Sequence, residues 1–371
     1  MCGANDEGPA HGKLEPGPVE RLGTVDAREA EVGGLRGGYE ARPGFDRALQ
    51  AVRQPGSTMK PIVYALGIRE ARFTPATVMI DAPAVYDQWQ PQNYETWRHQ
   101  GPVRLRVALA RSINVVAVRA IEDLGGPAVV TFAQALGIES ELDPSLSLAL
   151  GASGVRPMEM VNAYATLANG GRYQEPRFIT RIEGPDGDIE LPALQDERDV
   201  LTAAQAFVVT DMLTSVASEG GTAARAARLR TPVAGKTGTS NEARDAWFVG
   251  YTPQVVAGVW VGFDDRRSLG RRESGGRSAL PIWIDAVQST GVDAGATFAE
   301  PTGVVRVQVD PLSGLLPYEG QTDAIEEVFV EGTAPTETAR PPDVADSNTF
   351  LMEQYGTPAP APDQASPPTA P

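Results

Sequence analysis

The chain uses arginine almost to the exclusion of lysine, and this bias makes its few lysines informative. Of its 32 Lys and Arg residues, only Lys13, Lys60 and Lys236 are lysines. Arginine stays protonated in proteins, whereas a lysine amine can lose its proton and act as a base. Each lysine retained in such a sequence is therefore a candidate functional residue, and one that serves as a base could not be replaced by arginine.

Ser57 precedes Lys60 by three residues and opens a predicted apolar helix that runs to about Ile68. Residues three apart share one face of a helix, so the Lys60 amine can reach the Ser57 hydroxyl. A backbone N–H at the start of a helix is also suited to stabilising an oxyanion. A neutral Lys60, its pKa lowered by burial and by a nearby cation, would take the serine proton. A surface lysine is the alternative, but the apolar flanks of the segment do not fit it.

Ser112-Ile113-Asn114 lies at a break between two predicted helices, Val103–Arg111 and Val115–Leu124. Side chains two apart at such a break can point into one cleft. There Ser112 could shuttle a proton between Lys60 and a leaving amine, while Asn114 could hold a substrate amide carbonyl. The pattern alone is more often a helix cap, so its weight comes from its order and spacing relative to Ser57.

Lys236 lies on a predicted strand, Val233–Thr239, that carries a more specific pattern of glycine and hydroxyl residues. Gly238 would let a substrate backbone lie close and add as an extra strand. Lys236 and the neighbouring hydroxyls form a site for a carboxylate, and the Thr239 N–H is a second oxyanion donor. A phosphate-binding glycine loop is disfavoured because no G-x-x-x-x-G-K-[ST] precedes a helix. The substrate-binding residues expected here are Thr237, Gly238, Thr239 and Ser240.

Composition excludes several classes of function. The formal net charge of −16 argues against a nucleic-acid partner, since phosphate binding needs clustered Lys and Arg. Ten carboxylates against Arg340 alone, between Glu319 and Asp363, predict a solvated acidic tail. Cys2 is the only cysteine, and the two histidines are His11 and His99. Neither a metal site nor a cofactor is predicted, and a serine–histidine triad would have to use His99, which is expected to be an exposed loop residue.

Proline and glycine residues mark the expected ends of helices and strands along the chain. The further elements expected are a strand pair over Leu22–Tyr39, a long packed loop over 75–101, helices over Ala128–Leu136, Met158–Ala168 and Leu201–Ala217, a hairpin over Arg177–Leu191, strands over Ala246–Tyr251 and Val255–Phe263, and a helix from Pro281. The domains predicted are a disordered leader over 1–20, a catalytic domain over 21–295, a small β-rich extension over 296–334, and a disordered Pro/Ala-rich acidic tail over 335–371.

The combined motifs resemble the transpeptidase domain of class A (bifunctional) penicillin-binding proteins. The segments that carry the resemblance are Arg53–Pro61, Arg111–Asn114, Ser147–Ala152, Gly235–Ser240, Asp245–Pro253 and Pro281–Trp283. The resemblance implies an α+β fold of the penicillin-binding protein/serine β-lactamase type, with three layers and a five-stranded antiparallel sheet between helical groups. It also implies acylation of Ser57 by a D-Ala-D-Ala peptidoglycan stem peptide, transfer to a neighbouring stem's amine, inhibition by β-lactams, and a periplasmic or cell-envelope location.

Two features of the resembling proteins, a membrane helix and a glycosyltransferase domain, are not recognised in this sequence. No apolar run approaches the ~20 residues that span a membrane. A fragment, a truncated gene model and a stand-alone transpeptidase all fit, and a separate glycosyltransferase partner is a further possibility. Two other functions stay open: a D,D-carboxypeptidase or serine β-lactamase that uses water as acceptor, and a non-catalytic penicillin sensor or scaffold.

Overall fold

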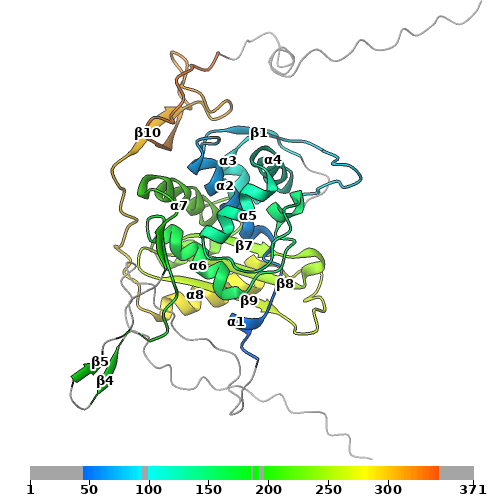
Figure 1. Cartoon of the computed structure of the whole chain (residues 1–371). Coiled ribbons are helices and arrows are strands. Elements are labelled where there is room, and N and C mark those ends of the chain that lie inside the picture. Colours follow the sequence, from blue (N-terminus) through cyan, green and yellow to red (C-terminus); the bar gives the residue numbers. More distant parts are fainter. Residues whose placement is uncertain are drawn as a thin grey trace, which may run out of the picture.

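The computed structural model describes residues 45–93, 99–179, 181–184, 187–189, 191 and 196–341. The described part is an α+β structure in which helices enclose a small antiparallel sheet (Figure 1). The expected leader over 1–20 and strand pair over Leu22–Tyr39 lie outside the described residues.

Helix α2 (Lys60–Arg69) runs through the centre of the helical part and is buried on every side. It follows a short 3-10 turn, η1 (Gly56–Met59), so Ser57 lies one turn before the α-helix and not on it. A helix that is apolar all round must be covered by other elements. The helices packed against α2 are α4 (Asn114–Leu124), α5 (Gly126–Ala135) and α7 (Ala203–Ala217).

Three consecutive strands form the sheet, as the sequence predicts: β7 (Ala234–Thr239), β8 (Asp245–Tyr251) and β9 (Val256–Gly262). They pair antiparallel in the order β7-β8-β9. Two further strands would be needed for the five-stranded sheet expected from the resemblance, and the described residues of this sheet supply three.

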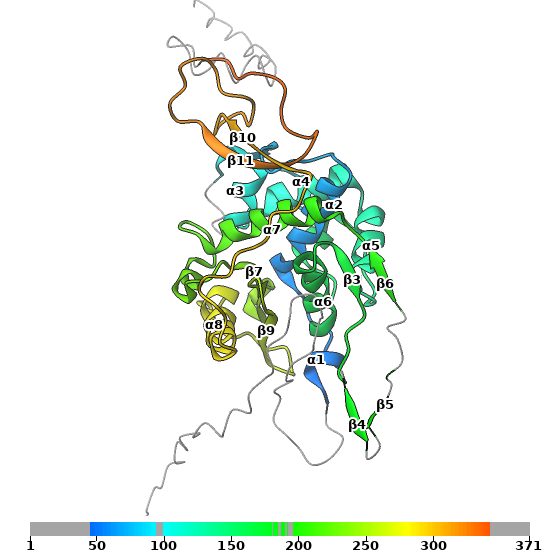
Figure 2. The same ribbon diagram turned by 90° about the vertical axis from the view of Figure 1, so that its left-hand side faces the viewer.

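Helices cover both faces of the sheet. Phe248 of β8 packs edge-on against Trp283 of α8 (Leu280–Ser289), with ring centroids 4.9 Å apart. On the other face, a Cβ at Gly258 of β9 would lie 2.3 Å from Val161 of α6 (Pro157–Ala168). Figure 2 shows α8 and α6 on opposite sides of β9. Successive residues of a strand point to opposite faces of the sheet, so each face packs against its own helix. Helix, sheet and helix thus form three layers.

The segment 75–101, expected to be a loop, contains a strand. β1 (Val78–Asp81) pairs antiparallel with β2 (Gly101–Arg104), and Val103 lies opposite Met79. Because Val103 belongs to this pair, the helix predicted from that residue begins at Leu105 (α3, Leu105–Ala110). Strands of four residues are too short to show a clear alternation in sequence. The other short pairs are β3 (Arg172–Gln174) with β6 (Glu197–Asp199), and the predicted hairpin β4 (Ile182–Gly184) with β5 (Gly187–Ile189).

The β-rich extension consists of β10 (Val304–Val309) and β11 (Ile325–Val330), which pair with each other. Buried Glu327 on β11 forms salt bridges with Arg104 and Arg106, which ties the extension to the helical part. The chain stays ordered beyond residue 335, where the sequence predicts a disordered tail. Ala339 donates its N–H to the Leu316 carbonyl at 2.7 Å, so the first residues of the expected tail are held against the extension. The rest of that tail, 342–371, lies outside the described residues.

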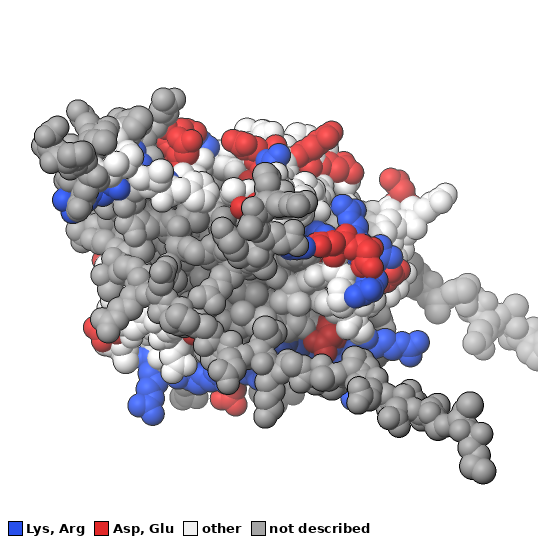
Figure 3. Space-filling model, turned by 90° about the horizontal axis from the view of Figure 1, so that it is seen from below, with Lys and Arg blue, Asp and Glu red and all other residues white. Residues whose placement is uncertain are grey.

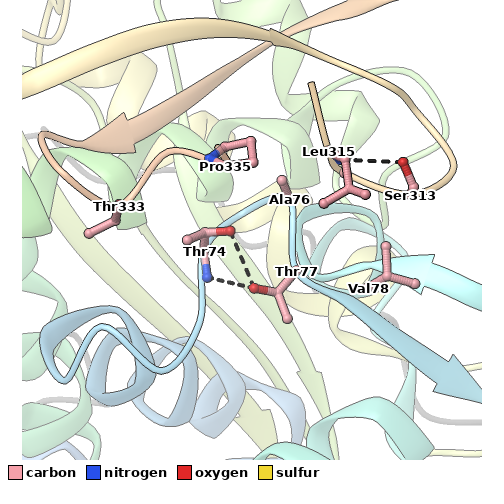
Figure 4. A pocket seen from close by; sticks show the side chains of 9 residues that line it. Thr74, Ala76, Thr77, Val78, Ser313, Leu315, Thr333 and Pro335 are labelled. Atoms are coloured by element: carbon pink, nitrogen blue, oxygen red, sulfur yellow. Dashed lines mark hydrogen bonds between the residues drawn. The ribbon is translucent and has the colours of Figure 1, made fainter. Parts of the chain in front are cut away.

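A cleft of about 390 Å³ lies where this extension packs against the segment that leads into β1. Thr74, Ala76 and Thr77 line one side and Ser313, Leu315, Thr333 and Pro335 the other (Figure 4). Thr74 and Thr77 are hydrogen-bonded to each other, and the lining holds no charged side chain. The cleft lies at the contact between the β-rich extension and the helical part, and it shares no residue with the site described below.

Charges are mixed on the face seen from below, where Arg and acidic side chains alternate along the part not covered by grey atoms (Figure 3). None of the described helices is both long and apolar enough to cross a bilayer.

Candidate active site

Ser57 lies in a tightly packed turn that requires glycine at two positions, Gly56 and Gly151. Gly56, before it, has a positive φ of 58°, and a Cβ there would lie 2.7 Å from the Thr239 carbonyl oxygen on β7. On the other side, a Cβ at Gly151 would lie 2.3 Å from the Gly56 carbonyl oxygen. Side chains cannot fit at such distances, so both positions need glycine. The backbone of the Ser57 turn is therefore held directly between β7 and the end of the 3-10 turn η2 (Leu146–Leu150).

Three long-range hydrogen bonds fix the same turn. The Tyr164 hydroxyl of α6 donates to the Thr58 carbonyl at 2.8 Å, within the core. The Trp247 indole of β8 donates to the Gln54 carbonyl at 2.8 Å, and the Gln54 side chain donates to the Ala152 carbonyl at 2.8 Å. The turn is thus tied to both the sheet and the helical part, while Ser57 itself stays half-exposed.

The Lys60 amine lies at the centre of the site and contacts the Ser112-Ile113-Asn114 segment. It donates to the Ser112 carbonyl at 2.7 Å and to Asn114 Oδ1 at 2.6 Å, and it lies 3.2 Å from Ser112 Oγ. The two carbonyl-type oxygens can use both N–H groups of a neutral amine, which leaves its lone pair free to accept a proton. The hydrogen bond to Ser57 expected from the spacing is not formed among the described residues, where the Ser57 hydroxyl has no hydrogen-bond partner.

Burial lowers the pKa of Lys60 well below its usual value, and the positive charge of Lys236 lowers it further. Both causes disfavour the protonated form of Lys60. They are the two causes that the sequence predicts for a lysine that serves as a base.

Ser112 has a left-handed backbone, with φ of 58°, which is uncommon for a residue with a side chain. This conformation ends α3 and places both the carbonyl and the hydroxyl of Ser112 within reach of Lys60. Strained backbone of this kind is concentrated at functional sites.

Asn93 is a site residue that the sequence does not predict. Its side-chain oxygen accepts hydrogen bonds from the N–H groups of Asn114 at 2.9 Å and Val115 at 3.3 Å, so it caps α4 from a distant segment. Its amide donates to buried Asp81 at 2.8 Å. The neighbouring Gln92 carbonyl accepts from Asn114 Nδ2 at 2.7 Å, which turns the Asn114 oxygen toward Lys60. The only signal in the sequence is an asparagine in an irregular proline-rich stretch.

Lys236 lies on β7, fully buried, and donates to the Thr237 carbonyl at 3.1 Å. Burial lowers its pKa to about 7, so near neutral pH the free site holds Lys236 in both protonation states. A carboxylate bound at the site expected around Lys236 would raise this pKa and favour the charged form.

The edge of β7 presents free N–H groups toward the Ser57 turn. Ser240 N–H bonds to the Asp245 carbonyl, so in this antiparallel register Gly238 and Lys236 also bond to β8. The N–H groups of Thr237 and Thr239 then point away from β8. Because Gly56 lies against Thr239, the N–H groups of Ser57 and Thr239 come from adjacent backbone segments, as an oxyanion hole requires.

Comparisons with known proteins show the family of the chain. Residues 20–282 match the family described as penicillin binding protein transpeptidase domain. The chain belongs to this family. Residues 300–340 match the family described as penicillin-binding protein 1A, C-terminal domain. This range contains β10 and β11 of the β-rich extension.

Curated relatives of this transpeptidase-family chain are penicillin-binding proteins 1A. The Aquifex aeolicus protein is 37% identical over 321 residues, which cover 85% of this chain and 44% of that protein. The Pseudomonas aeruginosa protein is 34% identical over 88% of this chain and 47% of its own length. The chain thus spans about half the length of these relatives.

Solved structures show the same fold. Penicillin-binding protein 1A from Haemophilus influenzae superposes with a TM-score of 0.72 at 31% identity, over 80% of this chain and 50% of that one. PonA1 from Mycobacterium tuberculosis, solved in complex with penicillin V, superposes with a TM-score of 0.61 at 27% identity, over 70% of this chain and 75% of that one.

Two residues of the β7 pattern, Gly238 and Ser240, make structural contacts within this transpeptidase domain. A Cβ at Gly238 would lie 2.3 Å from the Pro55 carbonyl oxygen and 2.9 Å from the Thr58 methyl group. Gly238 therefore lets β7 pack closely on the Ser57 turn. The Ser240 hydroxyl lies 3.2 Å from Asp245 Oδ2 and accepts from the Asp245 N–H at 2.9 Å, so it supports the β7–β8 hairpin.

His99 is not the exposed loop residue that the sequence predicts. It is partly buried, and its Nδ1 lies 3.1 Å from Asp81 Oδ1. Neither it nor Asp81 contacts Ser57 in the described structure. No cluster of three or more potential metal ligands occurs among the described residues.

Proposed function

We propose that this chain is a serine-type D,D-transpeptidase that cross-links peptidoglycan stem peptides and is inhibited by β-lactams. The catalytic residues proposed are Ser57, Lys60, Ser112, Asn114 and Lys236. Thr237 and Thr239 are proposed to bind substrate, with Gly238 and Ser240 shaping the strand that carries them.

Acylation begins with neutral Lys60, which takes the proton of the Ser57 hydroxyl. Ser57 Oγ attacks the carbonyl carbon of the penultimate D-Ala, and the N–H groups of Ser57 and Thr239 stabilise the oxyanion. The bond to the leaving D-Ala nitrogen breaks, and Lys60 returns the proton to that nitrogen through the Ser112 hydroxyl, which lies 3.2 Å from its amine. An acyl-enzyme ester on Ser57 remains.

Transfer reverses these roles. The amine of a second stem attacks the ester carbonyl, forms the new C–N bond and expels Ser57 Oγ. Lys60 accepts a proton from the attacking amine and supplies one to the departing serine oxygen, so the free site is regenerated.

One observation carries this proposal: a fully buried lysine amine, with its pKa lowered, is held by Ser112 and Asn114 one turn from a half-exposed serine. A buried amine without a carboxylate is costly unless it is used as a neutral base. A structural lysine would be expected to have an acidic partner.

Intact-mass spectrometry after exposure to a penicillin tests the proposal. We expect one stoichiometric adduct, mapped to the peptide that contains Ser57, and none on Ser57→Ala. Labelling of Ser112, or an adduct that survives Ser57→Ala, would overturn the assignment.

The fate of the two acyl groups separates the other functions. A transpeptidase keeps the penicillin adduct, and it transfers a donor peptide to an added amine. A β-lactamase releases the penicillin-derived acyl group to water, and a D,D-carboxypeptidase releases the donor peptide to water. A penicillin sensor keeps the adduct but transfers no donor peptide, and a scaffold forms no adduct. The structural neighbour PonA1 has been solved in complex with penicillin V, which supports the expectation that this chain binds a penicillin.

The proposal extends to the wider context of the chain. We propose that it acts at the cell envelope, that glycan polymerisation is carried out by a glycosyltransferase, and that the domain limits are 21–295 and 296–334. We also propose that the complete sheet has five antiparallel strands. Binding of a purified glycosyltransferase domain, measured with the full chain, tests the partner.

A further inference from the structure

A buried charged cluster joins the β-rich extension to α3 and α7, and it has no part in the proposed mechanism. At its centre, Glu327 of β11 is 1% exposed and forms salt bridges with Arg104 and Arg106. We propose that Glu327 is a positioning residue for the transpeptidase site, which acts through Arg106 and α3 on Ser112. This inference rests on the proposed function, in which Ser112 carries a proton to the leaving nitrogen.

Arg106 connects three elements of the fold. Its guanidinium donates to both carboxylate oxygens of Glu327 and to the Asp211 carboxylate of α7. It also donates to the Asp211 carbonyl at 2.9 Å and to the Ser215 hydroxyl at 3.0 Å. Figure 2 shows β11 close to α3 and α7, at one end of the helical part. Glu327 thus holds the planar fork of Arg106 in an orientation that reaches from α3 to α7.

Two arginines and two carboxylates make up this cluster. Burial alone lowers the pKa of Arg106, but the hydrogen bonds and charges of Glu327 and Asp211 raise this pKa above its usual value. Arg104 donates to Glu327 at 2.9 Å and to the Pro311 carbonyl at 3.0 Å. Loss of one member would leave a buried charge without its partner. The cluster therefore holds β11, α3 and α7 in one arrangement.

Helix α3 carries this restraint to Ser112. The helix has six residues, and Ser112 follows its end with a left-handed backbone. The Ser112 N–H donates to the Leu109 carbonyl at 3.1 Å, so its main chain stays bonded to the last helical turn. Arg106 and Ser112 are six positions apart, which is about 9 Å along a helix. A tilt of α3 at Arg106 therefore moves the Ser112 hydroxyl relative to Lys60.

The segment after α7 joins the same helix to the substrate-binding strand. Thr222 donates its N–H to the Ala110 carbonyl of α3 at 3.1 Å, and its hydroxyl lies 2.7 Å from the Thr237 hydroxyl of β7. Helix α7 itself packs against β7. The contact of Arg106 with α7 therefore fixes where Ser112 lies relative to β7.

A purely structural role for the cluster is the alternative, and the choice of acyl donor separates the two. Ser57 gives its proton to Lys60 with either donor. When the ring amide of a penicillin breaks, its nitrogen takes up the proton that Ser112 carries. The sulfur of a thioester leaves as a thiolate and needs no proton, because thiol pKa values lie near about 8.5. Displacement of Ser112 should therefore slow acylation by penicillin more than acylation by a thioester.

Second-order acylation constants for a penicillin and a thioester, measured on the full chain below its melting transition, test the inference. We expect Glu327→Gln to lower the ratio of the penicillin constant to the thioester constant by about tenfold or more, because proton transfer to a leaving group contributes ~10²–10⁴-fold. Glu326→Gln is the matched control. Glu326 precedes Glu327 on β11 but pairs with Arg306 at the surface, so the ratio should stay that of the parent.

Two further variants make the test specific. Adding Glu327→Gln to Ser112→Ala should lower the ratio no further than Ser112→Ala does alone, because both changes act on the same hydroxyl. Arg106→Lys keeps the cation beside Glu327, but one ammonium group cannot reproduce the fork that also binds Asp211. Arg106→Lys should lower the ratio as Glu327→Gln does, and it carries the test if Glu327→Gln does not fold.

Each result decides the matter. An unchanged ratio in Glu327→Gln, or an equal loss of both constants, overturns the inference. A further fall of the ratio when the change is added to Ser112→Ala overturns it as well. If Ser112→Ala itself keeps the parent ratio, the proton route through Ser112 is wrong and the inference falls with it, although the acyl-enzyme stands. If the parent forms no acyl-enzyme with either donor, the proposed function itself fails.

Discussion

Lys236 lowers the pKa of Lys60 across the site, although both lysines are fully buried and neither has a carboxylate partner in the part of the chain that the structure describes. Two buried amines of like charge cannot both stay protonated at low cost. The site therefore favours a state in which only one of the two amines is protonated. Once a carboxylate is bound, Lys236 is the protonated amine and Lys60 is the neutral base.

Arginine at each lysine position should separate these two roles. Lys60→Arg should reduce penicillin acylation by ~10²–10⁴-fold, because arginine keeps the cation and cannot act as a base. Lys236→Arg should lose less, since that position needs a cation to bind a carboxylate. Both lysines are fully buried, so the larger side chain is a comparable steric load at each. Equal loss in the two variants, or a greater loss at Lys236, would contradict the division of roles.

The acylation rate should follow a bell-shaped pH profile. The rate rises as Lys60 loses its proton and falls as Lys236 loses its own, with the descending limb of the free protein near the Lys236 pKa of about 7. Lys236→Ala should remove the descending limb. It should also move the ascending limb to higher pH, because Lys60 would no longer lie near a positive charge. Second-order acylation constants for the parent and this variant across the neutral range check both shifts.

Stability should also depend on the protonation of Lys236. Its pKa falls from 10.5 in the unfolded chain to about 7 in the fold, so between these values the unfolded state binds more protons. The free energy of unfolding from this group then rises with pH through that window, by at most about 1.4 kcal/mol per pH unit, and levels off below it. Chemical denaturation of the parent and of Lys236→Met should give difference curves with this slope. A pH-independent difference would show that Lys236 is not neutralised by folding.

The sequence predicts the parts of the site that depend on local spacing. Ser57 and Lys60 are three residues apart, and Lys236 lies on a strand whose glycine and threonine pattern is specific. The sequence does not predict the contacts that join distant segments. Asn93 caps Asn114 across 21 positions, and Gly151 packs on Gly56 across the helical part. Such contacts follow from how the elements pack, and a single glycine or asparagine in a loop carries no periodic signal.

The strands of the fold also divide into those that the local sequence predicts and those that depend on a distant partner. The three strands β7 to β9 are predicted because each has an apolar, β-rich run bounded by turns. β1 is missed because its partner β2 lies some twenty residues away, beyond a stretch rich in proline and aromatic residues. The role of Gly238 is likewise set by the approach of Pro55, which no pattern around β7 reveals.

Removing the side chain of Asn93 should reduce acylation without removing any group that contacts substrate. Asn93→Ala frees the N–H groups of Asn114 and Val115 and leaves the Asp81 carboxylate without one of its donors. Loss of a helix cap costs about 1 kcal/mol of stability, so the protein should still fold. Because Asn114 then holds Lys60 less firmly, the acylation rate should fall by about tenfold or more.

Gln92→Ala is the matched control, since Gln92 contributes only its backbone carbonyl to Asn114. It should acylate like the parent. A purely structural role for Asn93 would lower the melting temperature and leave the acylation rate of the folded protein unchanged, together with its pH profile. A positioning role predicts instead that the ascending limb of the profile shifts in Asn93→Ala, because Asn114 Oδ1 is one of the two oxygens that bind the Lys60 amine at under 3 Å. Stopped-flow acylation at several pH values, below the melting transition of each variant, distinguishes the two.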